Sequence, residues 1–365
     1  MNNTFKNVLH VIPSTHGGGA EEVAMRIASH QASHFNVHIA YWEAEAPESV
    51  GITFHKLRTQ IPLLPKPLII ILNLIWLTLR LRPKVVVSHL SYANLLSYFS
   101  TLAFRGIRRI MVHHSTTLPN WPASGIRLLK KAYLSPRTML VAVGVQTQSL
   151  LSTALGSDDI ATVLPNPLEL PKYTPRASDS HGLVRLMAVG RIAPVKNYGF
   201  LLQALSDLPA HFVLSIFGQG DVESLMHHIN RLGLNSRVTL EGAVSKESLY
   251  REFKNFEAFV MTSDLEGQPS SLIEAAASGL ATVGRDTPGL GEALSKVGGY
   301  RLTGEDTPKN FAKLLEESFD QNHSSKIRRR QGDWIKTHEA NIASHAYCEL
   351  IWSISSRENA HPSGF

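Results

Sequence analysis

Short apolar runs recur along both halves of this chain, and helical patterns separate most of them. In the first half these runs cover residues 8–12, 37–41, 84–88, 109–113 and 140–143. In the second half they cover residues 183–189, 212–217, 237–240, 258–261 and 281–283. Apolar strands that alternate with helices form parallel sheets with helices on both faces. The sequence therefore predicts an α/β protein, and no short internal repeat competes with that interpretation.

The chain of 365 residues is long enough for two domains. Residues 164–182 are rich in Pro, Ser and charge and have little periodicity, which predicts an interdomain linker. We expect two Rossmann-like, doubly wound domains that face a central cleft, an N-terminal one at 1–168 and a C-terminal one at 183–345. Residues 346–365 form a tail, for which a helix crossing back to the first domain is one option. Ligands of such sheets bind at the carboxyl ends of the strands.

Cysteine usage and the N-terminus favour a cytoplasmic protein. The single cysteine, Cys348, excludes an internal disulfide, and no cluster of Cys and His has the spacing of a zinc site. The first residues lead directly into an apolar run and lack the pattern of a secretion signal.

Positive charge is concentrated in the first half. Residues 1–170 hold 15 Lys and Arg against 8 Asp and Glu, a net charge of +7, and the remaining 21 and 22 give −1. A basic half could face anionic phospholipid, a lipid-diphosphate acceptor or nucleic acid, but no nucleic-acid-binding motif accompanies the charge. The apolar segment 68–79 is shorter than the roughly 20 residues of a membrane span. It predicts a buried amphipathic helix, with peripheral attachment to the inner membrane face as the alternative.

Two charged motifs in the second half belong together. Arg191 and Lys196 follow the apolar run 183–189, and Glu266 and Glu274 lie on either side of a Gly-x-Pro turn that opens a helix. Cations suit a diphosphate, and carboxylates suit the hydroxyls of a sugar and a ribose. The competing interpretation is two solvated loop cations and a capping box, in which Glu274 only satisfies a backbone N–H.

A glycine-rich loop precedes the first helical pattern. Gly17, Gly18 and Gly19 let the backbone approach an anion at a helix N-terminus. The loop lacks the third glycine of a dinucleotide fingerprint, because Glu22 stands there. Glu21 and Glu22 are also explained as favourable acids in the first turn of a helix.

These motifs resemble those of the retaining glycosyltransferases of family 4, which have the GT-B fold. The resemblance spans residues 7–300 and is strongest at 184–294. It implies that Arg191 and Lys196 stabilise the departing diphosphate, that Glu274 binds the ribose and that Glu266 orients the transferred sugar. It also implies that a histidine, His114 or its neighbour His113, completes the reacting pocket.

Further contacts follow from the same resemblance. The residues it adds to the substrate site are Gly18, Gly19, Gly218, Val244 and Gly267. Weaker histidine candidates are His89 and His16. Gly218 and Val244 belong to the segments 217–221 and 240–244, which match family landmarks and are equally explained as ordinary turns. The family's usual Pro-Asn-Gly-Val-Asp is Pro-Asn-Pro-Leu-Glu at 165–169, which stiffens the entry to the linker.

The sequence thus predicts a retaining, metal-independent hexosyltransferase without a cofactor. It would move a sugar from a nucleotide diphosphate, most simply a UDP-sugar, to a glycan or lipid-linked acceptor in cell-surface polysaccharide or lipopolysaccharide biosynthesis. Asp264 and Glu266 as a metal-binding pair are disfavoured, because metal-dependent glycosyltransferases have a single-sheet architecture. The alternatives are a GT-B-like epimerase or phosphorylase, and a non-catalytic subunit that binds sugar nucleotides.

Overall fold

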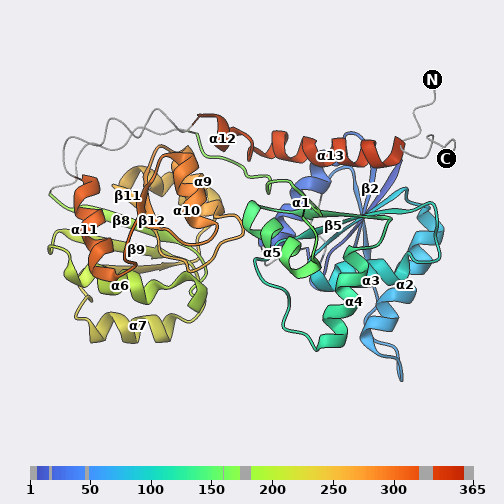
Figure 1. Cartoon of the computed structure of the whole chain (residues 1–365), viewed down its shortest axis with the longest axis horizontal. Coiled ribbons are helices and arrows are strands. Elements are labelled where there is room, and N and C mark those ends of the chain that lie inside the picture. Colours follow the sequence, from blue (N-terminus) through green and yellow to red (C-terminus); the bar gives the residue numbers. More distant parts are fainter. Residues whose placement is uncertain are drawn as a thin grey trace. The chain divides into compact units, whose positions relative to one another are not determined.

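The computed structural model describes residues 6–15, 19–45, 49–158, 160–172, 182–319 and 332–356. The chain divides into two compact units. Unit 1 comprises Met1–Pro167 and His338–Phe365, and unit 2 comprises Leu168–Thr337. Figure 1 labels the elements of both units.

Unit 1 contains a seven-stranded sheet in the order β3-β2-β1-β4-β5-β6-β7, and all of its strands are parallel. Its strands are β1 (Asn7–Val11), β2 (Asn36–Tyr41), β3 (Ile52–Lys56), β4 (Val85–His89), β5 (Arg108–His113), β6 (Thr138–Ala142) and β7 (Ala161–Val163). Every residue of β4 is buried. This strand lies at the centre of the sheet, where both faces are covered, and a continuous apolar run is the result.

Helices cover both faces of this sheet. They are α1 (Gly19–Gln31), α2 (Lys66–Leu81), α3 (Ser91–Ser100), α4 (Ala123–Tyr133), α5 (Val145–Leu155) and α13 (Ala340–Ser356). Side chains alternate between the faces of a strand, so Val85 and Val87 pack in the core cluster that also holds residues of α1 and α13, whereas Val86 packs with residues of α2 and α3. Figure 1 shows these two helix layers.

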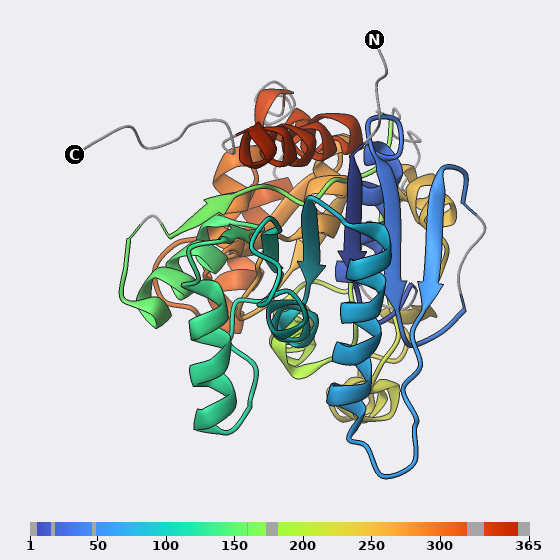
Figure 2. The ribbon, with the colours of Figure 1, turned by 90° about the vertical axis from the view of Figure 1, so that its right-hand side faces the viewer.

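Helix α2 contains the apolar segment of the sequence. It follows Pro65 with Pro67 in its first turn, and it ends where Arg82 adopts a left-handed conformation before Pro83. Proline suits the first turn and cannot continue a helix further on. Figure 2 looks onto unit 1 and shows the blue α2 in front of the strands. Within the described residues, no helix combines the length and hydropathy needed to cross a membrane.

Helix α13 returns the chain to unit 1. Tyr347, Cys348 and Ile351 of this helix are buried in one cluster with Val23 and Ile27 of α1. The return begins at His338 and the helix at Ala340, earlier than the boundary at 345/346 that the sequence suggested. The helical pattern of the sequence from Lys309 onward does not show where the chain stops packing on unit 2 and begins to pack on unit 1.

Unit 2 contains a six-stranded parallel sheet in the order β10-β9-β8-β11-β12-β13. Its strands are β8 (Val184–Val189), β9 (Phe212–Phe217), β10 (Val238–Gly242), β11 (Ala258–Met261), β12 (Ala281–Arg285) and β13 (Tyr300–Leu302). Its helices are α6 (Tyr198–Asp207), α7 (Val222–Arg231), α8 (Lys246–Glu252), α9 (Ser270–Ala277), α10 (Leu290–Val297), α11 (Pro308–Phe319) and α12 (Gly332–Lys336), with 3-10 turns η1 (Pro194–Lys196) and η2 (Phe253–Asn255).

The predicted α/β class with two parallel sheets is confirmed. All ten apolar runs are strands, whereas β3, β7 and β13 were not predicted. Each of these three lies at the edge of its sheet and has exposed or half-buried residues, so its sequence lacks an apolar run. Within the predicted linker 164–182, Leu168 is buried in the core of unit 2. Residues 173–181 of this segment lie outside the described part of the chain.

Candidate functional site

Three loops of unit 2 meet at the carboxyl edge of its sheet. The loop after β8 is hydrogen-bonded to the loop after β9, since the Ile192 amide donates to the Gln219 carbonyl over 2.9 Å. The Asp264 amide in the loop after β11 donates to the Val195 carbonyl in the loop after β8, over 2.9 Å, so these two loops are also in contact. Ligands of parallel α/β sheets bind at this edge, and the four charged residues predicted from the sequence all lie on these loops or on α9.

Two glycines permit the close approach of these loops. A Cβ on Gly218, whose φ is +156°, would lie 2.0 Å from the carbonyl oxygen of Gly190. A Cβ on Gly289, at φ +80°, would lie 1.9 Å from the carbonyl oxygen of Glu266. Only glycine fits such positions. Gly218 therefore has a packing role in the structure, and its contact with a substrate remains a prediction.

Lys196 and Glu266 form an ion pair. Lys196 Nζ lies 2.6 Å from Glu266 Oε1, and the two side chains are 22% and 11% exposed. The Thr262 hydroxyl donates to the carbonyls of Lys196 and Asn197 and so holds the η1 turn against the end of β11. Two predicted site residues, 70 positions apart, are thus in direct contact. The pair is partly shielded from water, where charges interact more strongly than at an exposed surface.

Arg191 is exposed at the start of the same loop. Its guanidinium has no hydrogen-bond or ionic partner among the residues that the structure describes. Gly190 precedes it, and the Gly190 amide donates to the Phe217 carbonyl over 2.9 Å, which fixes the backbone at this point. A planar cation with five unused donors on a fixed loop is suited to bind a phosphate group.

Glu274 is buried in α9, with 4% exposure. Lys246 Nζ lies 3.3 Å from its Oε1 atom. The helix begins at Ser270 after Pro269, without a side-chain cap, and the Ser271 hydroxyl donates to the Val189 carbonyl over 3.3 Å. The capping box considered for Ser271 and Glu274 is therefore not the arrangement at this helix start. Ser271 instead connects α9 with the end of β8, two residues before Arg191.

Asp264 and Glu266 are each paired with a cation of the protein. The Arg285 Nη1 atom lies 2.6 Å from Asp264 Oδ1, and the Asn197 side chain donates from Nδ2 to the same oxygen over 2.8 Å. Glu266 is paired with Lys196. The two carboxylates thus have separate partners, Arg285 for Asp264 and Lys196 for Glu266.

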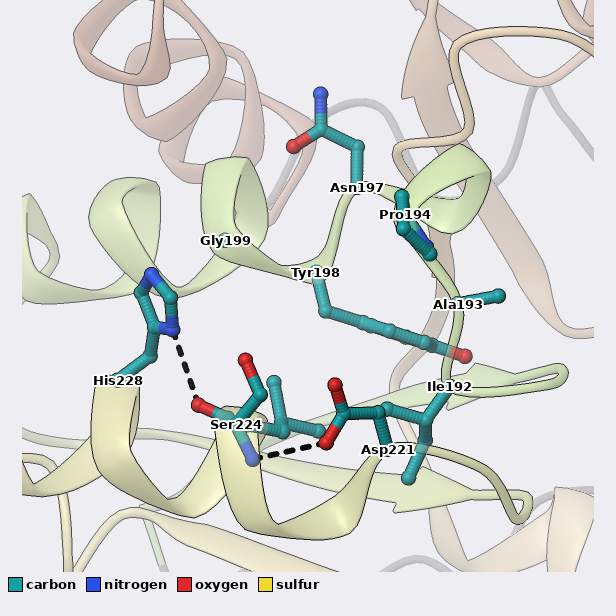
Figure 3. A pocket seen from close by; sticks show the side chains of 10 residues that line it. Ile192, Ala193, Pro194, Asn197, Tyr198, Gly199, Asp221, Ser224 and His228 are labelled. Carbon is teal, nitrogen blue, oxygen red and sulfur yellow. Dashed lines mark hydrogen bonds between the residues drawn. The ribbon is translucent and has the colours of Figure 1, made fainter.

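A pocket in unit 2 lies beside the loop that follows β8, between α6 and α7 (Figure 3). Its lining includes Ile192, Tyr198, Asp221 and His228. The Asp221 carboxylate caps α7 by accepting from the Ser224 amide over 3.1 Å. None of the four charged residues of the predicted site lines this pocket, so it is separate from the place where the predicted cations and acids gather.

Lys246 is the site residue that the sequence analysis missed. It opens α8, directly after the loop that contains Val244, whose side chain is 41% exposed. A lysine at the start of a surface helix carries no sequence signal, and only its contact with Glu274 marks it. Gly267, half-buried beside Glu266, lies on the same edge of the sheet, and the substrate contacts of Val244 and Gly267 remain predictions.

His113 in unit 1 is part of the core. It is buried at the end of β5, with its Nδ1 atom 2.9 Å from the Tyr133 hydroxyl. Asn94 donates to that hydroxyl over 3.2 Å. Burial lowers the pKa of His113 to about 4, so the imidazole is neutral near pH 7. These contacts give His113 a structural role.

His114 belongs to a column of three imidazoles. Its Nε2 atom lies 3.0 Å from His89 Nδ1, and the His89 ring stacks on His10 with centroids 5.7 Å apart. His10 in turn lies 2.8 Å from Gln31 Oε1 through its Nε2 atom. Burial lowers the pKa of His114 to about 3 and that of His10 to about 4. His10 lies inside the strand β1 and belongs to no motif, so it was not predicted. The contact of His114 or His89 with a sugar remains a prediction.

The glycine loop is only partly described. His16 and Gly18 lie outside the described residues, and Gly19 is the first residue of α1. A Cβ on Gly19 would meet no atom of the described residues within 4 Å, so packing against them does not require a glycine there. Glu21 and Glu22 occupy the first turn, and Glu22 pairs with Arg26 over 2.9 Å. Their role as helix-stabilising acids is in agreement with this geometry.

Comparison with known families identifies the class of protein. Residues 180–334 match the family "Glycosyl transferases group 1", and residues 17–171 match "Glycosyltransferase Family 4". The chain belongs to these group 1 glycosyltransferases, as its motifs suggested.

Individual relatives are distant. The D-inositol 3-phosphate glycosyltransferase of Mycolicibacterium smegmatis is 26% identical over 227 residues, which are 57% of this chain and 52% of that protein. The amylovoran biosynthesis glycosyltransferase AmsK of Erwinia amylovora is 26% identical over 57% of this chain and 50% of its own length. The matches thus span about half the length of these curated relatives.

Solved structures confirm the GT-B fold class. The crystal structure of Anabaena HepE in complex with UDP has a TM-score of 0.80 at 17% identity and covers 95% of this chain and all (100%) of that one. The lipopolysaccharide outer core galactosyltransferase WaaB, in its apo form, has a TM-score of 0.73 at 17% identity and covers 95% and 99%. At such identities the likeness is one of fold.

Proposed function

We propose that this protein is a retaining, metal-independent glycosyltransferase that moves a sugar from a UDP-sugar to an acceptor hydroxyl. The observation that carries the proposal is the Lys196–Glu266 ion pair, on the same sheet edge as Arg191, which has no ionic partner within the described part of the chain. A catalyst of this reaction needs cations for a departing diphosphate and a carboxylate near the sugar carbon that becomes positive. Both are present here, and each is positioned by backbone contacts between loops.

The reaction breaks the bond between the anomeric carbon and the diphosphate oxygen. The acceptor oxygen forms the new bond on the same face of the sugar, and its proton passes to the departing phosphate oxygen. Arg191 and Lys196 neutralise the charge that grows on the diphosphate. Glu266 stabilises the positive anomeric carbon, and Glu274 accepts hydrogen bonds from the ribose hydroxyls. Lys196 exchanges the Glu266 carboxylate for a phosphate oxygen when the donor binds, which leaves Glu266 to face the sugar.

The relatives support the choice of donor and acceptor class. The HepE structures contain UDP and UDP-glucose. AmsK is named for amylovoran biosynthesis and WaaB for the lipopolysaccharide outer core. We propose a surface polysaccharide or lipopolysaccharide precursor as the acceptor, which also agrees with the net charge of +7 in residues 1–170, from 15 cations and 8 anions.

Thermal unfolding with a panel of nucleotide sugars tests the donor. A UDP-sugar at 100 times its dissociation constant should stabilise the protein by about 2.7 kcal/mol, with or without a chelator of divalent ions. Glu274→Ala should abolish this shift, whereas the exposed Lys254→Ala should leave it unchanged. A shift that depends on Mg²⁺, or one produced by GDP-sugars alone, contradicts the proposed donor chemistry.

Incubation with radiolabelled UDP-sugars and a membrane glycolipid extract separates the alternative activities. Label transferred to lipid supports a glycosyltransferase. Label in a free epimer identifies an epimerase, and bound label without turnover identifies a binding subunit.

A surface stripe on α2 supports contact with a membrane. Leu68, Leu72, Trp76 and Leu79 are 42%, 47%, 56% and 57% exposed, and their spacing places them along one side of the helix. The Arg80 guanidinium lies 5.3 Å from the centroid of the Trp76 ring. An apolar stripe with a neighbouring cation is typical of helices that lie in the interface of an anionic membrane. We propose that α2 holds the enzyme at the membrane that carries its acceptor.

Cosedimentation with lipid vesicles tests this attachment. The protein should bind phosphatidylglycerol vesicles, and the double variant Leu72→Ser/Trp76→Ser should bind at least about tenfold more weakly, because each side chain buried in lipid contributes about 1.5–3 kcal/mol. Leu134→Ser, which removes another exposed leucine of unit 1, is the control and should bind normally. Failure of the wild-type protein to bind anionic vesicles at low salt overturns the proposal.

A further inference from the structure

A second group of reactive side chains lies in unit 1, where α13 packs on α1 (Figure 1). Ligand atoms of His30, His34 and Cys348 all lie within 4.8 Å of one another. Cys348 is fully buried and the two histidines are half-buried. None of these residues is among those predicted to bind the nucleotide sugar.

The two helices present these side chains by ordinary helical spacing. His30 is in the last turn of α1. His34 lies in the turn that follows, where its backbone amide donates to the Gln31 carbonyl over 2.9 Å. On α13, His345 and Cys348 are three residues apart and share a face. The His345 ring lies 6.3 Å from that of His30 and 6.5 Å from that of His34, between centroids. His345 is therefore a fourth potential ligand at the same place.

The donor atoms of this group are available for a ligand. His30 Nε2 is buried and has no hydrogen-bond partner among the residues that the structure describes, and the Cys348 thiol forms no disulfide there. Buried polar atoms normally have partners, so an unpaired one in a native protein indicates a missing water or ion. His345 Nε2 faces Glu349 Oε1 over 3.7 Å. A carboxylate behind a histidine orients the other ring nitrogen toward a metal in many metal sites.

We propose that His30, His34, His345 and Cys348 bind one zinc ion. Imidazole and thiolate are ligands of Zn²⁺ and related transition metals, whereas Mg²⁺ and Ca²⁺ require oxygen. Zinc holds nitrogen at about 2.0–2.1 Å and sulfur at about 2.3 Å, which places tetrahedral ligands about 3.3–3.6 Å apart. Small side-chain rotations bring the ligand atoms from separations of up to 4.8 Å to this spacing. The thiol releases its proton to solvent as the zinc–sulfur bond forms.

Four protein ligands and no open position make this a structural site. His30 lies at the end of α1, His34 lies in the turn after it, and the other two ligands are on α13, so the ion fastens the returning helix to the body of unit 1. Search by sequence spacing does not find it, because the two pairs of ligands are separated by nearly the whole chain.

Cobalt titration of the full-length, untagged protein tests the proposal. One equivalent of Co²⁺ should produce visible d–d bands of a tetrahedral centre and a near-ultraviolet thiolate-to-cobalt band, and Zn²⁺ should remove both. The chain has one cysteine, so the thiolate band can arise only from Cys348. Absence of that band in the folded wild-type protein overturns the proposal.

Variants locate the other ligands. Cys348→Ala should lose the thiolate band, and Cys348→Ala and His30→Gln should each bind Zn²⁺ at least about tenfold more weakly. The control is His55→Gln, since His55 and His38 form another close histidine pair in unit 1, 3.1 Å apart, and it should bind normally. Loss of binding in the control, with normal binding in His30→Gln, places the metal elsewhere and contradicts the site. Circular dichroism of the metal-free variants establishes that they fold.

Discussion

Replacement of Lys196 by alanine should lower kcat/KM for sugar transfer about a hundred- to a thousandfold, which corresponds to about 2.7–4 kcal/mol of lost transition-state stabilisation. Lys196 is positioned before any ligand binds, by the η1 turn and by its ion pair with Glu266 over 2.6 Å. A positioned cation needs no reorganisation when the diphosphate acquires charge. Steady-state kinetics with the donor identified by thermal shift measures the effect, and Lys254→Ala should keep normal kinetics.

The ion pair raises a second explanation for such a loss, because the variant leaves Glu266, 11% exposed, without its cation. Removal of one partner of a buried pair destabilises a protein by several kcal/mol when the pair is fully desolvated, and by less here, where Lys196 is 22% exposed. The double variant Lys196→Ala/Glu266→Gln removes the unpaired charge. It should recover thermal stability but not UDP affinity. Recovery of UDP affinity in the double variant means that Lys196 acts only on Glu266.

Acid should destabilise unit 1 through its buried histidines. Burial lowers the pKa of His10 and His113 to about 4 and that of His114 to about 3, whereas an unfolded histidine has a pKa of about 6.5. Below pH 6.5 the unfolded chain therefore binds protons that the folded chain does not. The free energy of unfolding falls as the pH drops from 6.5 toward 4, by about 1.4 kcal/mol per pH unit for each histidine.

Urea unfolding at pH 7 and pH 5 measures this loss. Four of the five tryptophans, Trp42, Trp76, Trp121 and Trp352, lie in unit 1, so fluorescence reports mainly on this unit. His113→Phe should reduce the pH dependence by about one proton. His227→Phe in unit 2 is the control and should leave the dependence of unit 1 unchanged. Equal stability at both pH values contradicts the assignment of these histidines as buried and neutral.

The sequence predicted the central strands, which are buried on both sides, and one edge strand, β10. Central strands such as β4 are continuous apolar runs, whereas the edge strands β3, β7 and β13 contain exposed or half-buried residues and lack such a run. Without an apolar run, the periodicity of these three strands does not distinguish them from loops.

The candidate site could be predicted only in part. Motifs indicated Lys196 and Glu266, and the structure brings them together. Lys246 and His10 belong to no motif, and spatial contacts mark them instead, that of Lys246 with Glu274 and that of His10 with His89. Capping preference suggested that Ser271 caps its own helix, whereas its hydroxyl donates to the Val189 carbonyl at the end of β8.

The return of α13 to unit 1 has a consequence for biosynthesis. Residues 168–337 are translated between the body of unit 1 and its last helix, so the ribosome completes the whole of unit 2 before Tyr347 and Ile351 can cover the apolar side of α1. The apolar side of α1 in the nascent N-terminal half therefore stays uncovered while the 170 residues 168–337 are translated. A premature stop just after unit 2 would leave unit 2 complete in sequence and damage the half of the protein that was made first.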